Sequence, residues 1–274
     1  MARSDAPALP LGEAGALANP RLHDFVQLSL SMTSPMHWHC LQHVPFEGPG
    51  HLATWVAERR HTMTFTKLWE DASFPPPDQY DGLFILGGPM NVYEDSKYTW
   101  LTEEKKFIAL AVKERKPVLG ICLGAQLLSI TMGGSVTKSR YNEIGWFPIH
   151  LTRESHSSFP FCDFPDHFMA FHWHGDRFSI PPGATHVANS DACHEQAFVY
   201  KDHVVGVQFH LESTYDNIAS LIEHCGDDIG VGPYIQHPKA IQDLADCLPS
   251  ARYNLFKLLD SLIGTRPAGS KQAL

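Results

Sequence analysis

The sequence predicts an α/β protein, a three-layer sandwich in which helices cover both faces of a mostly parallel sheet. Apolar stretches of about four to eight residues alternate along the chain with segments that have helical spacing. Several of these stretches are apolar throughout, which is typical of strands buried on both faces. Strands and helices that alternate in this way indicate successive βαβ units and therefore a parallel sheet.

The first expected strand begins at Met36. In chain order we expect a strand at 36–42, a helix at 50–60 and a strand at 62–68, then a Pro-rich loop over 74–77. The next expected elements are a strand at 82–86, a helix at 102–116, a strand at 117–121 and a helix at 123–132. The helix at 102–116 places Phe107, Ile108 and Ala111 on one side and its charged residues on the other, which predicts one buried face.

From about residue 144 the apolar segments become shorter, and turn residues separate them. The expected strands are 144–151, 167–172, 186–190, 196–200 and 204–209, which could form hairpins or return to the same sheet. Helices are expected at 214–224, 240–245 and 251–263. We therefore expect a single domain over 36–274 with C-terminal helices. Residues 1–35 show no strand or helix period and are expected to form a flexible N-terminal extension.

Composition limits the classes of function. The net charge of −9 argues against a surface built to neutralise phosphates, so we expect no nucleic-acid partner. No apolar run approaches the roughly 20 residues of a membrane-spanning helix, and the N-terminus lacks the pattern of a secretory signal. The six cysteines are scattered and form no CxxC pair, which is typical of reduced thiols in a cytoplasmic protein.

Cys122 lies at the junction between an apolar strand and the following helix. Gly120 and Gly124 flank it two residues away on each side, which is the cysteine version of the Gly-x-nucleophile-x-Gly elbow. In such a sharp turn a side chain at either flanking position would collide with neighbouring backbone. The positive end of the following helix favours the thiolate, the reactive form of cysteine. The pattern predicts a nucleophile rather than an inert buried thiol.

A proton shuttle for this thiol is expected at His210. The chain has 17 histidines, so position rather than presence must decide. His210 follows the apolar strand 204–209, at the carboxyl edge where the active sites of open α/β sheets lie. Glu212 is two residues further on and would face the same way in extended chain, so its carboxylate is placed to orient the imidazole.

Attack on an amide places negative charge on the carbonyl oxygen, which two backbone N–H groups can stabilise. One donor is expected at Leu123, the residue after the nucleophile. The other is expected from Gly87-Gly88, at the end of the strand 82–86, where glycine lets the backbone approach a ligand closely.

Three segments together resemble the signature blocks of the class I glutamine amidotransferases, in family order: Gly87-Gly88-Pro89, Gly120-Ile-Cys122-Leu-Gly-Ala-Gln126 and Gln208-Phe-His210-Leu-Glu212. A fourth, His174-Gly-Asp176, is similar to another block. The resemblance spans about 36–212 and looks closest to stand-alone proteins resembling the glutaminase domain of GMP synthase.

The resemblance implies the family fold and a Cys122–His210–Glu212 triad that forms a γ-glutamyl thioester and releases ammonia and glutamate. It implies oxyanion donors at Gly88 and Leu123. It also implies substrate contacts from the following residues: Gln126, Trp173, His174 and Gly175. Trp173 stands where relatives often have a small or amide residue, so its side chain departs from the family pattern.

Two other functions use the same triad: a γ-glutamyl peptidase or hydrolase, and a weakly active regulatory protein. The sequence carries no recognisable synthetase domain or phosphate-binding loop, so a separate synthetase or ammonia-acceptor subunit is expected. No cofactor is expected. The pairs His37/His39 and His172/His174 could suggest a metal site, but each lies on an expected core strand without a second pair, so no metal is expected either.

Overall fold

The structure is a computed structural model that describes residues 34–226 and 229–264, and the described residues form one compact unit from Ser34 onward. The predicted extension over 1–35 lies outside the described residues except for its last two. Within the described ranges no helix is both long and apolar enough to cross a bilayer.

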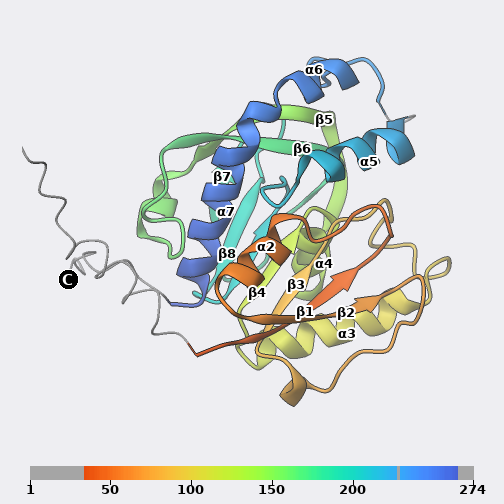
Figure 1. The fold of residues 1–274 in the computed structure, drawn as a ribbon, viewed down its shortest axis with the longest axis vertical. Helices are drawn as coiled ribbons and strands as arrows, with labels where there is room; N and C mark the ends of the chain where they lie inside the picture. Colours follow the sequence, from red (N-terminus) through yellow and green to blue (C-terminus); the bar gives the residue numbers. More distant parts are fainter. Residues whose placement is uncertain (1–33, 227–228, 265–274) are drawn as a thin grey trace, which may run out of the picture. The chain divides into compact units, whose positions relative to one another are not determined.

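A single nine-stranded sheet forms the centre of this unit (Figure 1). Its parallel part has the order β2-β1-β3-β4-β9. An antiparallel part continues the sheet in the order β8-β7-β5-β6. The parallel strands are β1 (His37–Gln42), β2 (Thr62–Lys67), β3 (Gly82–Ile85), β4 (Val118–Ile121) and β9 (Val204–Val207). The antiparallel strands are β5 (Val136–Leu151), β6 (His167–Phe178), β7 (Ala184–Asn189) and β8 (Ala197–Tyr200).

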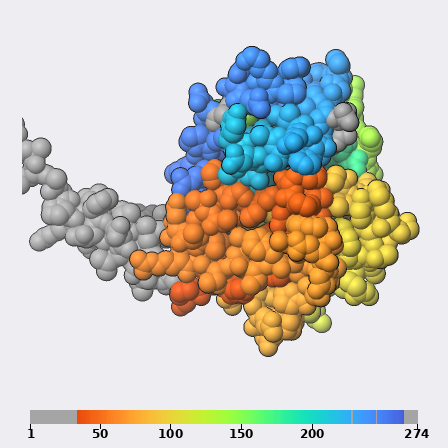
Figure 2. Space-filling view, turned by 45° about the vertical axis from the view of Figure 1, so that its right-hand side comes forward, coloured from red at the N-terminus to blue at the C-terminus, as the bar shows by residue number. Residues whose placement is uncertain are grey.

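Helices pack on both faces of the sheet and give the three layers. One face carries α2 (His51–Glu58), α5 (Tyr215–Cys225) and α7 (Leu248–Leu262), and the other carries α3 (Trp100–Lys113) and α4 (Leu123–Thr131). The space-filling view shows the C-terminal segment against the early part of the domain, where α7 contacts α2 (Figure 2). The remaining helices are α6 (Pro238–Asp243) and the short 3-10 turns Pro77–Gln79, Arg153–Ser157 and Ala245–Cys247.

Successive residues of the buried strands supply two separate cores. In β4, Val118 packs with α3 and α4, whereas its neighbour Leu119 belongs to the core under α2 and α7. Both side chains are fully buried. Because each face of the strand is covered, the alternation expected of a half-exposed strand is absent, which is why β4 has a continuous apolar sequence. Each such side chain contributes about 1.5–3 kcal/mol by leaving water.

Strands β5 and β6 are longer than the sequence predicted. The expected strands 144–151 and 167–172 correspond only to parts of them, because Thr137–Glu143 is polar and lacks an apolar pattern. The structure pairs the two strands as a long antiparallel arm with a register shift between Lys138 and Glu143. The sheet curls at this end, so that Phe171 of β6 forms an isolated bridge with His210 beyond β9.

This arrangement gathers the predicted site residues at one edge of the sheet. Strands β3, β4 and β9 are neighbours and run in parallel. Gly88 follows β3, Cys122 follows β4 and His210 follows β9, so all three lie beyond the carboxyl ends of adjacent strands. The curl brings β6 to the same edge from the other end of the sheet.

Candidate active site

Cys122 adopts a strained backbone conformation at the start of α4, with φ 52° and ψ −110°. Positive φ is uncommon for a residue with a side chain and costs on the order of 1–3 kcal/mol. Two packing contacts hold the turn in place. A Cβ on Gly124 would lie 2.7 Å from the carbonyl carbon of Ile85, and one on Gly120 would lie 2.6 Å from the oxygen of Gly124. Both flanking positions therefore require glycine, as the elbow pattern predicted.

The predicted base and its orienting acid lie side by side. His210 Nδ1 is 2.6 Å from Glu212 Oε1, and both side chains are buried. Burial disfavours a charged imidazole, but the charge of Glu212 and hydrogen bonds with Cys122 and Glu212 outweigh it and raise the pKa of His210 well above its ordinary value. The geometry therefore supports a Cys–His–Glu triad in which His210 can hold a proton at neutral pH.

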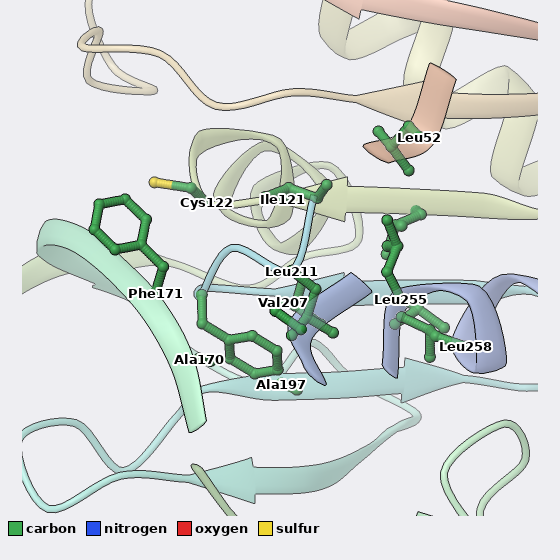
Figure 3. Packing of buried hydrophobic residues seen from close by; sticks show 14 of the residues in the cluster. Leu52, Ile121, Cys122, Ala170, Phe171, Ala197, Val207, Leu211, Leu255 and Leu258 are labelled. Atoms are coloured by element: carbon green, nitrogen blue, oxygen red, sulfur yellow. The ribbon is translucent and has the colours of Figure 1, made fainter. Parts of the chain in front are cut away.

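The nucleophile faces the curled end of β6. Figure 3 shows Cys122 next to Ile121 at the end of β4, with its sulfur directed toward the side where Phe171 lies. The Cys122 Sγ lies 3.8 Å from the carbonyl oxygen of Trp173, and the backbone N–H of His210 donates to the carbonyl of Phe171 at 2.8 Å. The β6 segment thus contacts both Cys122 and His210.

Two backbone N–H groups are available beside the sulfur. Neither the N–H of Gly88 nor that of Leu123 makes a hydrogen bond to any other described residue. Leu123 is the first residue of α4, where such an N–H has no acceptor within the helix. A Cβ on Gly88 would lie 3.0 Å from Leu123 Cδ2, so the two residues are packed against each other. Their placement fits the predicted oxyanion hole.

A cavity of about 320 Å³ opens over these groups. This volume is at the lower end of the range, roughly 300–1,000 Å³, in which proteins hold small molecules. Among the predicted site residues it is lined by Gly88, Cys122, Gln126, Trp173, His174, Gly175 and His210. Glu212 and Leu123 do not line it; Glu212 lies behind the imidazole. Gln126 Nε2 donates to Gln208 Oε1 at 3.2 Å, which fixes this amide at the wall of the cavity.

A buried polar network supports the wall formed by His174. His174 Nε2 lies 3.2 Å from Glu143 Oε2, and its Nδ1 donates to the carbonyl of Asp176. The same oxygen of Glu143 accepts hydrogen bonds from Ser190 Oγ at 3.0 Å and Gln196 Nε2 at 2.6 Å. Burial favours the neutral acid, but His172, His174 and the hydrogen bond from Ser190 outweigh it and lower the pKa of Glu143. We interpret the network as support for the β6 segment.

The same network supplies the partner that the sequence did not reveal for His172 and His174. One ligand atom from each of Glu143, His172 and His174 lies within 4.8 Å of the others, a spacing that could hold a metal ion. The oxygen of Glu143 nearest to both rings accepts hydrogen bonds from Ser190 and Gln196 and lies 3.2 Å from His174 Nε2, whereas His172 Nδ1 only approaches it, at 3.5 Å. The rings of His37 and His39 contact threonine hydroxyls of β2 instead.

Glu47 is a site residue that sequence reasoning missed. It lines the cavity from the loop after β1, and its carboxylate is next to Gly87, where a Cβ would also lie 3.3 Å from His210 Cε1. Burial, partly offset by the charges of His210 and His43, raises the pKa of Glu47. Its position just beyond a parallel strand is the signal that could have found it, since β1 ends at the same edge as the other site strands.

Comparisons with known proteins agree with this geometry. A family model described as glutamine amidotransferase class-I matches residues 52–225. YfeJ of Salmonella typhimurium, a glutamine amidotransferase-like protein, is 32% identical over 198 residues, which cover 71% of this chain and 83% of that protein. A glutamine-hydrolyzing GMP synthase subunit from Picrophilus torridus is 35% identical over 134 residues, 48% of this chain and 67% of that one.

The fold also has a counterpart among crystal structures. A glutamine amidotransferase from Thermotoga maritima superimposes with a TM-score of 0.77 at 29% identity, over 85% of this chain and 100% of that one. The α/β fold class expected from the sequence is thereby confirmed, with a large curled mixed sheet. Gly88, Cys122 and His210 all lie within the matched residues 52–225.

Proposed function

Because the chain belongs to the class I glutamine amidotransferase family, we propose that it hydrolyses the side-chain amide of glutamine through a γ-glutamyl thioester on Cys122. The observation that carries the proposal is the strained elbow of Cys122, whose thiol contacts His210 of the buried His210–Glu212 pair and lines one cavity with Gly88. A nucleophile, a base with its orienting acid, and an oxyanion hole are the parts that acyl transfer requires.

In the acylation step the sulfur of Cys122 attacks the amide carbon while His210 holds the thiol proton. The carbonyl oxygen gains negative charge between the N–H groups of Gly88 and Leu123. His210 then gives its proton to the amide nitrogen, the C–N bond breaks and ammonia leaves. The γ-glutamyl group stays on the sulfur as a thioester. Glu212 stabilises the imidazolium through its 2.6 Å contact with Nδ1.

Water completes the reaction. His210 takes a proton from a water molecule, whose oxygen attacks the thioester carbon, and the same two N–H groups hold the second oxyanion. The C–S bond breaks, glutamate leaves, and the proton on His210 returns to the sulfur. The far end of the substrate is held by Gln126 and by the backbone of Trp173–Gly175, which line the same cavity.

The reactive thiol and the family relatives suggest the setting. A cysteine nucleophile must stay reduced, and Cys40, Cys193 and Cys247 are also free thiols, which supports a cytoplasmic location. One relative is a glutamine-hydrolyzing GMP synthase subunit, which supports a separate synthetase or ammonia-acceptor partner for this chain.

A second candidate is the hydrolysis of γ-glutamyl amides whose leaving amine is larger than ammonia. The leaving nitrogen must approach His210, because that imidazole gives it a proton. Glu47 borders this side of the site, and Leu221 of α5 lines the same cavity. The loop that carries Glu47 packs on α5, where Phe46 stacks on His224 with a centroid separation of 4.6 Å. An amine with an apolar stem and a positive charge would fit this wall.

The test uses the purified chain with glutamine and with a set of γ-glutamyl amides, and measures released glutamate. Hydroxylamine added during turnover should trap γ-glutamyl hydroxamate, which reports the thioester. Cys122→Ala should form neither product. Glutamate release that persists in Cys122→Ala would refute the proposal. Trapped thioester with negligible steady-state turnover would instead favour the weakly active regulatory protein.

A further inference from the structure

His43 and Glu104 form a buried pair in contact with the Gly87–Gly88 segment, which carries the proposed oxyanion donor. His43 follows β1, and Glu104 lies on α3, on the face that packs against the sheet. His43 Nε2 is 2.9 Å from Glu104 Oε1, and both side chains are completely buried. The other ring nitrogen, Nδ1, is 3.0 Å from the carbonyl oxygen of Gly87. The imidazole therefore bridges α3 and the loop that carries the proposed oxyanion donor.

These contacts favour a charged His43. A carbonyl oxygen can only accept, so Nδ1 must donate to Gly87. Nε2 faces the carboxyl group of Glu104, and where it donates to that group both ring nitrogens carry protons. Burial opposes this charge, but the carboxylate of Glu104 outweighs it, helped by Glu47 and the carbonyl of Gly87, and raises the pKa of His43. The charge-assisted bond to Gly87 is stronger than one between neutral groups.

The bond to Gly87 also sets the direction of the next N–H. The peptide between Gly87 and Gly88 is trans, because the one cis bond within the described residues is Phe159–Pro160. In a trans peptide the C=O and N–H point in opposite directions. With the carbonyl of Gly87 held by His43, the N–H of Gly88 points away from the buried ring. Gly88 lines the cavity, and its N–H is unengaged.

We propose that the His43–Glu104 pair is a positioning device that holds the Gly87–Gly88 peptide in its oxyanion-binding orientation. The proposal rests on the proposed function, in which the N–H of Gly88 stabilises the charged intermediate. A peptide whose carbonyl accepts a strong hydrogen bond is also polarised into a better donor, by roughly 10–30%. Losing or misdirecting one oxyanion donor costs about 100- to 1,000-fold in kcat.

A purely structural role for His43 predicts a different pattern, and alkylation by iodoacetamide separates the two. In that reaction the sulfur of Cys122 forms a bond to a saturated carbon and iodide leaves, so no oxyanion develops. Alkylation therefore reports the nucleophile and His210 but not the Gly88 N–H. A distorted fold would slow alkylation and amide hydrolysis together, whereas loss of the oxyanion donor would slow hydrolysis alone.

Three variants test the proposal. His43→Leu removes the donor to Gly87 with little change of bulk, and we expect kcat on glutamine to fall by about 100-fold or more while KM changes little. The alkylation rate of Cys122 should stay at the wild-type value. His43→Asn keeps a neutral donor near the position of Nδ1 and should restore part of kcat. Glu104→Gln should lower kcat by about tenfold by weakening the donor.

His39→Leu is the matched control. His39 is a buried histidine of β1 that contacts Thr64 and Thr66 of β2, so the same substitution there should leave kcat unchanged. A folded His43→Leu or Glu104→Gln protein with wild-type kcat would overturn the proposal, as would a parallel loss of alkylation and hydrolysis in His43→Asn and Glu104→Gln. If His43→Leu does not fold, the kcat values and alkylation rates of His43→Asn and Glu104→Gln test the proposal. A wild-type protein that turns over neither glutamine nor another γ-glutamyl amide would instead refute the proposed function.

Discussion

The elbow of Cys122 offers a direct test of how tightly the nucleophile is placed. A Cβ added at Gly124 would overlap the carbonyl oxygen of Ile85 and lie 2.7 Å from its carbon, whereas ordinary contact begins at 3.4 Å, so the start of α4 must move by more than about 0.7 Å. A misplacement of about 1 Å can cost on the order of 100-fold in rate. We therefore expect Gly124→Ala to lower kcat on glutamine by about 30- to 100-fold, although Cys122, His210 and Glu212 are all retained.

The assay is steady-state glutamate release, with thermal unfolding measured on the same samples. Overpacking at Gly124 should also reduce the free energy of unfolding by about 1–3 kcal/mol. Gly226→Ala is the matched control, because a Cβ there meets nothing within 4 Å and its φ of −59° suits alanine. A folded Gly124→Ala protein with wild-type turnover would refute the reasoning that contact with β3 sets the position of the sulfur.

Four further predictions concern the triad, its charge, the cavity and the chain ends. Cys122→Ser should lower glutamate release at least about 1,000-fold; a smaller loss would point to another nucleophile. The raised pKa of His210 should place the alkaline limb of the kcat profile above pH 6.5, and Glu212→Gln, which removes the charge that raises it, should move that limb to lower pH. The raised pKa of His210 also adds to the free energy of unfolding below about pH 6.5, and this contribution is lost as pH rises through the raised pKa. The same pH dependence of unfolding in Glu212→Gln as in the wild-type protein would contradict this. Glu47→Gln should reduce kcat/KM about tenfold for a γ-glutamyl amide of a cationic amine, relative to a neutral amine of equal length; unchanged preference would exclude Glu47 from the leaving-group side. A chain over 36–274 should keep the activity and melting temperature of the full chain; a large fall in melting temperature would show that residues 1–35 pack on the domain.

The proposed triad could be predicted because local sequence patterns indicate it. A glycine-flanked cysteine between an apolar strand and a helix has few structural alternatives, and His210 follows another buried strand with Glu212 two residues on. These patterns depend on nearest neighbours in the chain. The adjacency of β3 and β4 follows from the usual behaviour of a βαβ unit, whereas β9 pairs with β4 only after the chain has formed β5 to β8.

The support around the triad was not predictable in the same way. The role proposed for His43 depends on its contacts with Glu104, which is 61 residues away on α3, and with the carbonyl of Gly87. Glu143 lies in a polar stretch with no strand pattern, yet register with β6 places it beside His174. Contacts of this kind depend on tertiary packing, and a single sequence carries no periodic signal for them. The strand-end position of His43 and Glu47 was the available clue.

Because the sheet curls, the site residues come from two parts of the fold, one tightly packed on both faces and one partly exposed to solvent. Cys122 and His210 lie just beyond the ends of buried parallel strands, where almost any substitution disturbs packing on two faces. Trp173 and Gly175 instead belong to an antiparallel arm, where neighbours such as Lys138 and Asn142 are partly solvent-exposed and also line the cavity. Substitutions in the arm can therefore reshape the wall that meets the substrate without moving the sulfur. Directed evolution toward a new acyl donor would be expected to accumulate its substitutions in this arm first, while Cys122 and His210 stay unchanged.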